Sequence, residues 1–388
     1  MSNSFLPYGR QSIDQADIDA VTDVLRGDWL TTGPAVREFE QDFEAATGAP
    51  HARACSNGTT ALHLALAASG LGRGDVAIVP AITFMATANA ARYCGAEVVF
   101  ADVDAQTGLM TAATLQDAID RAGGRVQAVL PVHLAGQVCD MPAIEPLARA
   151  AGAVVVEDSC HAIGTTTPWG EVGNCAHADA ATFSFHPVKT IAAGEGGLVT
   201  TARADTARQI EILRSHGIER DPGRHERQED EPWWHEMQAL GWNFRLSDIQ
   251  AALARSQLRR LAAFKARRQA LAAAYDGALD GLAPVVQPIA RVPGNDACLH
   301  LYAARIDFAA AGLTRSQVMS GLREHGIGTQ VHYIPVSDQP YYRARYGQID
   351  LPGARHYYER TLSLPLYQGM SDDDPVRVVE ALKMVMAL

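Results

Sequence analysis

The sequence predicts an α/β fold built on a mostly parallel sheet, followed by a smaller C-terminal α+β part. Two observations support this prediction: short apolar runs alternate with stretches of helical length, and the runs are continuously apolar. Strands buried on both faces give such continuous runs, and parallel strands need crossover connections, usually helices, between them. We therefore expect a sheet covered by helices on both faces.

Six apolar runs supply the predicted strands, and three helical stretches lie between several of them. The strands are expected at 76–80, 98–101, 128–131, 154–157, 180–184 and 198–201, and the helices at 87–93, 111–122 and 142–151. An amphipathic helix is predicted earlier, over 11–27, where Gly27 is a plausible stop. Its apolar side would hold Ile13, Ile18, Val21, Val24 and Leu25.

From about Ser247 the pattern predicts a second unit. A long helix is expected over 249–264, then a strand at 301–306, a helix at 315–325 and a C-terminal helix from Pro375. We assign 1–250 to a large α/β domain and 251–388 to a small C-terminal domain, since 388 residues are enough for two cores. The stretch 221–231 is dense in charges and turn formers, and it predicts a surface loop.

Composition excludes several classes of function. A net charge of −11 argues against general nucleic-acid or anionic-membrane binding, because such partners need clustered Lys and Arg. The sequence shows neither a secretion signal nor an 18-residue apolar stretch, so we expect a cytoplasmic protein. The six cysteines form no CxxC pair, which favours reduced thiols over a zinc site or disulfides.

Lys189 is the first candidate for chemistry. It lies in the stretch Phe183–Thr190, between an apolar strand end and the glycine-rich turn Gly194–Gly197. An ammonium that loses solvation has a lowered pKa, as an imine-forming lysine requires. The alternative is an ordinary solvated lysine on the surface.

The stretch Ser56–Thr59 opens a strongly helical run with small polar residues. The free N–H groups at such a helix start can bind a phosphate, and Gly58 lets the anion approach the backbone while Thr59 offers a hydroxyl. Simple N-capping explains the same residues without any ligand.

Asp158 directly follows the predicted strand 154–157, and ligands of parallel sheets gather at the carboxyl ends of strands. A buried carboxylate there needs a cation or strong donors, although a helix-capping role is the alternative. Cys160 and His161 follow it, but no further residues complete a metal site. Phe84 lies past another strand end, where its ring either packs in the core or stacks on a flat cofactor.

A strand-end aspartate, a positioned lysine, a Gly/Thr helix start and an edge phenylalanine together suggest pyridoxal 5'-phosphate (PLP). With these residues the sequence resembles the sugar aminotransferases of the DegT/DnrJ/EryC1/StrS family, which have the type I PLP-dependent aminotransferase fold. The resemblance runs from about Pro7 to Leu366. The motifs that carry it lie at 28–34, 56–59, 157–162, 183–197 and 241–250.

The resemblance implies a role for each matching position. Lys189 would form the Schiff base with PLP and move the proton, and Asp158 would keep the pyridine nitrogen protonated. The other cofactor contacts would be Gly58, Thr59, Phe84, His161, Ser184 and Asn243, with Asn243 reaching the phosphate from the partner subunit of a homodimer. The implied substrate contacts are Trp29, Thr31 and His332, while Arg214, Arg220 and Arg245 are candidates for the nucleotide diphosphate or else surface charges.

Within the family, the stretches 7–11, 186–190, 216–218 and 232–238 are most similar to transaminases of pseudaminic acid synthesis. This likeness implies transfer of an amino group from L-glutamate to a UDP-linked 4-keto-6-deoxy-N-acetylhexosamine, giving UDP-4-amino-4,6-dideoxy-N-acetyl-β-L-altrosamine. Two alternatives stay open: another nucleotide-sugar 4- or 3-aminotransferase, and a catalytically silent nucleotide-sugar binding regulator on the same fold.

Two other classes are disfavoured by particular residues. The dehydratases of the family replace the lysine that Lys189 matches. A nicotinamide-dependent oxidoreductase needs a glycine fingerprint, whereas the glycines at 70–74 follow a helix and lack the GxGxxG spacing.

Overall fold

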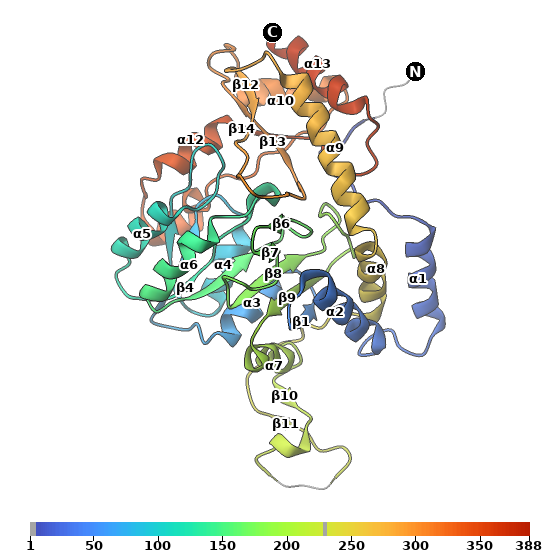
Figure 1. Ribbon diagram of the computed structural model, residues 1–388. Coiled ribbons are helices and arrows are strands. Elements are labelled where there is room, and N and C mark those ends of the chain that lie inside the picture. The colour runs from blue at the N-terminus through green and yellow to red at the C-terminus, as the bar shows by residue number, and fades with distance from the viewer. Residues whose placement is uncertain (1–4, 228–230) are drawn as a thin grey trace.

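The computed structural model describes residues 5–227 and 231–388, and a seven-stranded sheet lies at its centre (Figure 1). The strand order is β1-β9-β8-β5-β4-β2-β3; β9 runs antiparallel to both neighbours and every other pair is parallel. The predicted α/β class is confirmed and all six predicted strands are present, although β4 lies earlier than the predicted 128–131; β1 is an additional strand. The bounds are β1 His51–Cys55, β2 Asp75–Pro80, β3 Glu97–Ala101, β4 Arg125–Val129, β5 Val154–Asp158, β8 Ala180–Ser184 and β9 Gly197–Thr201.

Helices cover both faces of this sheet, as predicted. The chain moves along the sheet in one direction from β2 to β3 and in the opposite direction from β3 to β4 and on to β5. Because such crossovers are right-handed, α4 lies on one face of the sheet and α5 and α6 lie on the other. The contacts agree: α3 packs against α4, and α5 packs against α6. The bounds are α1 Gln15–Arg26, α2 Pro34–Thr47, α3 Gly58–Ala68, α4 Met85–Tyr93, α5 Ala112–Arg121, α6 Met141–Ala150 and α7 Ala204–Leu213.

The C-terminal part holds a three-stranded antiparallel sheet of β12 (Val286–Pro288), β13 (Tyr302–Ile306) and β14 (Thr361–Leu364). The helix predicted over 249–264 is in fact two helices, α8 and α9. The helices are α8 Asp248–Leu258, α9 Leu261–Leu279, α10 Arg315–Glu324, α11 Pro340–Tyr346, α12 Pro352–Arg360 and α13 Asp374–Met386. Within 5–227 and 231–388, no helix has the length and apolarity needed to cross a membrane.

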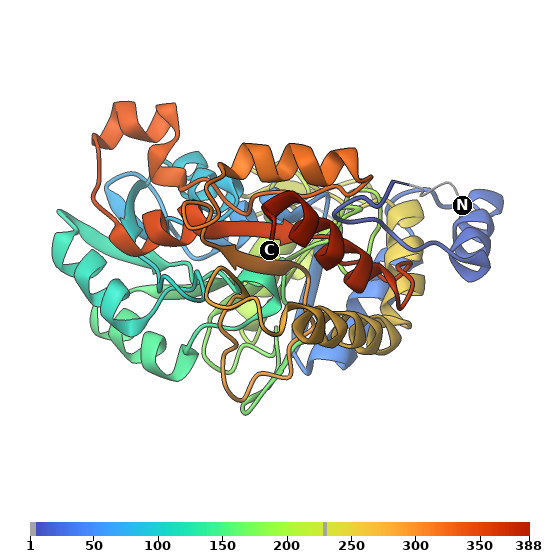
Figure 2. The ribbon, with the colours of Figure 1, turned by 90° about the horizontal axis from the view of Figure 1, so that it is seen from above.

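Two apolar cores accompany this arrangement. The larger surrounds the seven-stranded sheet, and the smaller lies among α9, α10, α13 and the antiparallel sheet. Figure 2 shows the orange and red C-terminal elements lying over the N-terminal part. The predicted boundary after residue 250 falls within α8, which packs against α1 and α2. The division into two domains stays a prediction.

Two exposed apolar regions are notable in a single chain. The side chains of Ile18 and Leu25 in α1 are 51% and 57% exposed, although the predicted helix itself is confirmed. A hairpin of β10 (Ile218–Glu219) and β11 (Glu236–Met237) extends away from the sheet at the bottom of Figure 1. It carries exposed Met237. Of the loop predicted over 221–231, residues 228–230 lie outside the described residues.

Candidate active site

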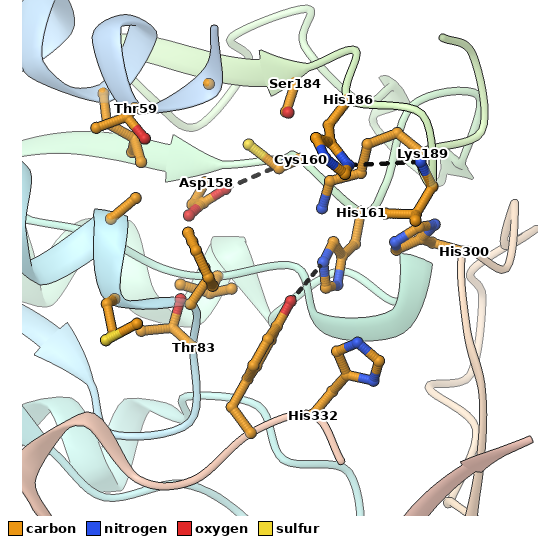
Figure 3. Close-up of a pocket in the computed structure, with 18 of the residues that line it drawn as sticks. Thr59, Thr83, Asp158, Cys160, His161, Ser184, His186, Lys189, His300 and His332 are labelled. Atoms are coloured by element: carbon orange, nitrogen blue, oxygen red, sulfur yellow. Dashed lines mark hydrogen bonds between the residues drawn. The ribbon is translucent and has the colours of Figure 1, made fainter. Parts of the chain in front are cut away.

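A cavity of about 620 Å³ lies beside the carboxyl ends of β5 and β8 (Figure 3). It contains side chains from segments far apart in the sequence, including the start of α3, the loop before α4 and the 330–334 segment. Eight residues predicted for cofactor or substrate meet around it: Gly58, Thr59, Phe84, Asp158, His161, Ser184, Lys189 and His332.

Lys189 lies on the loop that joins β8 to β9. The loop is closed at its base, where Phe185 N–H donates to Gly196 O at 2.8 Å, and Lys189 N–H donates to His186 O at 2.8 Å. Burial lowers the pKa of the Lys189 amine, while Cys160 and Asp158 oppose that shift. The amine therefore lies in the cavity and loses its proton more readily than a solvated lysine does, as an imine-forming lysine requires.

Asp158 is the last residue of β5 and is 6% exposed. The hydroxyl of Thr87 in α4 donates to one carboxylate oxygen at 2.7 Å, and the N–H of Cys160 donates to the other at 3.2 Å. In the described parts of the chain, no Lys, Arg or His forms an ion pair with it; its only donors are uncharged. Such a carboxylate is suited to a cation brought by a ligand.

The start of α3 forms the opposite side of the cavity. Asn57 caps this helix by accepting from Thr60 N–H at 2.9 Å, so the N–H groups of Gly58 and Thr59 belong to the first turn, which a helix leaves without internal partners. A Cβ added at Gly58 would lie 2.7 Å from Ser184 Cβ. Glycine is therefore required for β8 and α3 to approach each other here.

His161 has its hydrogen bonds fixed on both ring nitrogens. The N–H of Ala135 donates to Nδ1 at 3.3 Å, which leaves the proton of the neutral ring on Nε2, and Nε2 lies 3.1 Å from the hydroxyl of Tyr333 (dashed line in Figure 3). Burial lowers the pKa of His161 well below its usual range, with a further contribution from Lys189. The ring is neutral and its orientation is set by the backbone.

Three observations show that these residues are suited to binding PLP. Asp158 lacks a cation, as a carboxylate facing a protonated pyridine nitrogen would. The N–H groups at the start of α3 face a cavity that a Cβ at Gly58 would narrow, as suits a phosphate. The amine of Lys189 lies in the same cavity with a lowered pKa, as suits bonding to an aldehyde.

His332 lines the cavity from the C-terminal part. Its Nδ1 lies 2.8 Å from the hydroxyl of Ser363, and burial together with Lys189 lowers the pKa of His332 to about 3. The ring is thus neutral at physiological pH. It can accept or donate a hydrogen bond but does not supply a positive charge to a diphosphate.

Six predicted residues lie outside the cavity of a single chain, and one of them, Arg220, is exposed directly after β10. Trp29 and Thr31 are exposed between α1 and α2, and Asn243 is exposed beside Ser215. Arg245 donates to the hydroxyl of Ser215 at 3.2 Å. Arg214 pairs with buried Glu40 at 2.6 Å and donates to Ala54 O, so its guanidinium is used within the chain.

Three residues for which the sequence predicts no role also lie at the site. Thr87 holds Asp158, Tyr333 contacts His161, and the ring of His300 lies 4.4 Å from that of His161. Thr83 and Thr87 are four residues apart in the sequence, and their hydroxyls lie 2.8 Å apart, so their spacing is the feature of the sequence that points to Thr87. No such spacing in the sequence points to Tyr333 or His300.

Residues 11–383 match the DegT/DnrJ/EryC1/StrS aminotransferase family. The chain is 41% identical over 384 residues to the spore coat polysaccharide biosynthesis protein SpsC of Bacillus subtilis, covering 98% of this chain and 97% of SpsC. Among solved structures it is similar to Helicobacter pylori PseC, an aminotransferase involved in the biosynthesis of pseudoaminic acid, with a TM-score of 0.90, 26% identity and coverage of 99% and 100%.

The chain is also similar to Spr1654 of Streptococcus pneumoniae in its PLP form, with a TM-score of 0.88, 28% identity and coverage of 99% of both chains. These likenesses cover nearly the whole chain, and they confirm the predicted type I aminotransferase fold. The chain belongs to the DegT/DnrJ/EryC1/StrS aminotransferase family and is a PLP-dependent sugar aminotransferase.

Proposed function

We propose that the protein transfers an amino group from L-glutamate to C4 of a UDP-linked 4-keto-6-deoxy-N-acetylhexosamine. The product would be UDP-4-amino-4,6-dideoxy-N-acetyl-β-L-altrosamine, a precursor of pseudaminic acid. The observation that carries the proposal is the meeting of Lys189, Asp158 and the α3 start in one cavity. Similarity to PseC supports the choice of sugar.

PLP would be held by Asp158 at its ring nitrogen, by Gly58, Thr59 and Ser184 at its phosphate, by Phe84 and His161 near its ring, and by Lys189 at its aldehyde. When bound, it supplies an electron sink for the carbon that loses a proton. Lys189 takes the proton from the amino donor and, in the second half of the reaction, gives one to the sugar carbon. Its lowered pKa suits both directions.

Asp158 has an electrostatic role in both halves. Its buried carboxylate favours a protonated pyridine nitrogen, and the hydrogen bonds from Thr87 and Cys160 fix its direction. The neutral rings of His161 and His332 let sugar and donor atoms bind without a competing charge near Lys189.

A second candidate is another nucleotide-sugar 4- or 3-aminotransferase. The likeness to SpsC, a polysaccharide biosynthesis protein, supports this reading, because its identity of 41% exceeds the 26% to PseC. The two candidates share the amine chemistry and differ in the sugar.

The proposal includes a homodimer with shared active sites. Asn243, Trp29 and Thr31 lie outside the cavity of one chain, so they would serve the partner's site. Exposed apolar side chains on α1 and the β10–β11 hairpin supply surface for such an interface. The cytoplasmic location is part of the same proposal.

The test is turnover with purified protein. PLP should give a visible absorption band that L-glutamate removes, and a UDP-4-keto-6-deoxy sugar should restore the band while its amino sugar appears. Comparing 4-keto sugars of both C5 configurations with a 3-keto sugar separates the two candidates. Lys189→Ala should abolish the band and turnover; an unaltered rate in that variant would contradict the proposal. A band indifferent to every amino donor would support the silent regulator.

A further inference from the structure

Arg268 is the largest fully buried side chain outside the cavity that carries a charge. It lies on α9, is 0% exposed, and occupies the buried face of that helix together with Leu271, Ala272 and Tyr275. Burial lowers its pKa to about 10, so the guanidinium still carries its charge at neutral pH. Its hydrogen bonds are to uncharged oxygens, and no carboxylate of the described residues pairs with it.

The guanidinium forms hydrogen bonds with two chain segments, 299–300 and 366–368. One nitrogen donates to the carbonyl oxygens of Leu299, His300 and Leu366 at 3.1–3.2 Å, and the other donates to the side-chain oxygen of Gln368 at 3.2 Å. A buried cation costs several kcal/mol unless it is well compensated, and backbone dipoles supply the compensation here. Both segments are thereby fixed to α9.

Each of these segments also contacts a wall of the active-site cavity. His300 itself lines the cavity, and its N–H donates to Ala135 O at 3.1 Å. Leu366 N–H donates to the carbonyl oxygen of Tyr8, another lining residue, at 3.1 Å. The amide of Gln368 donates to Thr190 O at 2.9 Å, one residue beyond Lys189.

We infer that Arg268 is a positioning residue for catalysis: it holds Gln368 against the loop of Lys189 and thereby sets where the lysine amine lies. The inference rests on the proposed role of Lys189 and names a residue that touches neither cofactor nor substrate. The connection runs from the guanidinium to the Gln368 oxygen, and from the Gln368 amide to the backbone next to Lys189.

Two substitutions cut this connection at different points. Arg268→Lys keeps a cation that can reach the three carbonyl oxygens, but an ammonium lacks the second arm that binds Gln368. Gln368→Met leaves Arg268 in place and removes the donor to Thr190. Arg267→Lys is the matched control: neighbouring Arg267 is partly exposed, pairs with Asp372 and donates to Met370 O, but it has no hydrogen bond to Gln368 or to the loop of Lys189 among the described residues.

The readouts are the dissociation constant of PLP, the visible band of the lysine-bound cofactor, and kcat and KM for L-glutamate. We expect Arg268→Lys and Gln368→Met each to weaken PLP binding and to lower kcat by about 10-fold to 100-fold with KM little changed, since misplacing a reacting group by about 1 Å has effects of that size. The double variant should be no worse than the worse single variant, and Arg267→Lys should resemble wild type.

Wild-type values in both substituted proteins would overturn the inference, as would effects that multiply in the double variant, because independent effects show no shared connection. If Arg268→Lys does not fold, Gln368→Met and its PLP dissociation constant decide alone. Failure of the proposed function is distinguishable, since then wild type and Arg267→Lys would also lack the band or turnover.

Discussion

At Lys189, the enclosure that lowers the pKa of the amine also decides when the residue can react. A neutral amine attacks an aldehyde and an ammonium does not. Burial raises the fraction of neutral amine at a given pH, whereas the Asp158 charge reduces it. The rate at which cofactor-free protein binds PLP should therefore depend on pH, and both Lys189 and Asp158 should affect this dependence.

We predict that the rate of PLP capture rises with pH and levels off below pH 10.5, the ordinary pKa of lysine. In Asp158→Asn the opposing charge is removed, so the plateau should begin at a lower pH than in wild type. Stopped-flow absorbance across a pH series measures both. A plateau that moves upward in Asp158→Asn would contradict the electrostatic account.

Thr87 shows how one hydroxyl can serve a catalytic carboxylate. Thr87→Val keeps the shape but removes the donor 2.7 Å from Asp158, and an unpaired buried acceptor costs about 1–3 kcal/mol. We expect kcat to fall by roughly 10-fold, corresponding to about 1.4 kcal/mol, while Thr87→Ser stays near wild type. Steady-state kinetics tests this, and equal rates for Val and Ser would argue against the bond's role.

At the scale of elements, the site depends on how closely β8, β9 and α3 approach one another. Gly58 faces Ser184, and a Cβ at Gly197 would lie 2.1 Å from Asn57 O. Each glycine lies at a contact between two elements. Because Ser184 pairs with Gly197 in the β8–β9 register, both glycines lie in the same region, next to the start of α3, where the phosphate is proposed to bind.

Gly58→Ala should therefore push α3 away from β8. We expect PLP binding to weaken by at least about 10-fold, since the added methyl meets Ser184 at 2.7 Å and overpacking costs about 1–3 kcal/mol. Gly277→Ala, in α9 with nothing within 4 Å of the new Cβ, is the control and should bind PLP normally. Titration of the visible band gives both constants.

The elements themselves were largely predictable. Strands buried on both faces gave continuous apolar runs, so six strands and the helices between them could be recognised locally. β1 is as long as most of the other strands, but its sequence predicts no strand because His51 and Arg53 interrupt the apolar run. The break between α8 and α9 was missed because no Gly or Pro marks it, and the antiparallel direction of β9 is a property of pairing that its own residues do not encode.

For the whole molecule, the open question is what covers the apolar surface of α1. The helix buries only Asp17 in its own chain, where Gln257 donates to the carboxylate at 2.6 Å and Arg260 pairs with it. Its predicted apolar side is exposed at Ile18 and Leu25. A partner subunit would explain both this surface and the distance of Asn243 from the cavity.

We predict that two inactive variants restore each other in a mixture. Lys189→Ala and Asn243→Ala would each lack activity alone, but a hybrid dimer would hold one site with both residues intact. Random exchange of subunits should restore about a quarter of the sites. Refolding the variants together and measuring turnover tests this; no recovery from a mixture that sedimentation shows to be dimeric would place Asn243 outside the partner's site.

The candidate site was predictable only in part, for reasons of distance along the chain. Residues near strand ends, such as Asp158 and Lys189, can be recognised in the sequence because the apolar strands before them predict where they lie. Tyr333 and Arg268 act through contacts with segments more than 30 residues away from them, such as the one from Tyr333 to His161. Such contacts form only after the two parts of the chain pack together, so local sequence gives no sign of them.

Before any cofactor arrives, the buried carboxyl group of Asp158 has only uncharged hydrogen-bond donors among the described residues. A ligand that binds only the folded form stabilises it by about 2.7 kcal/mol at a hundredfold excess over its dissociation constant. In a cell short of vitamin B6, a larger share of these chains would be unfolded at any moment and open to proteases. The abundance of the protein would then follow the supply of the vitamin.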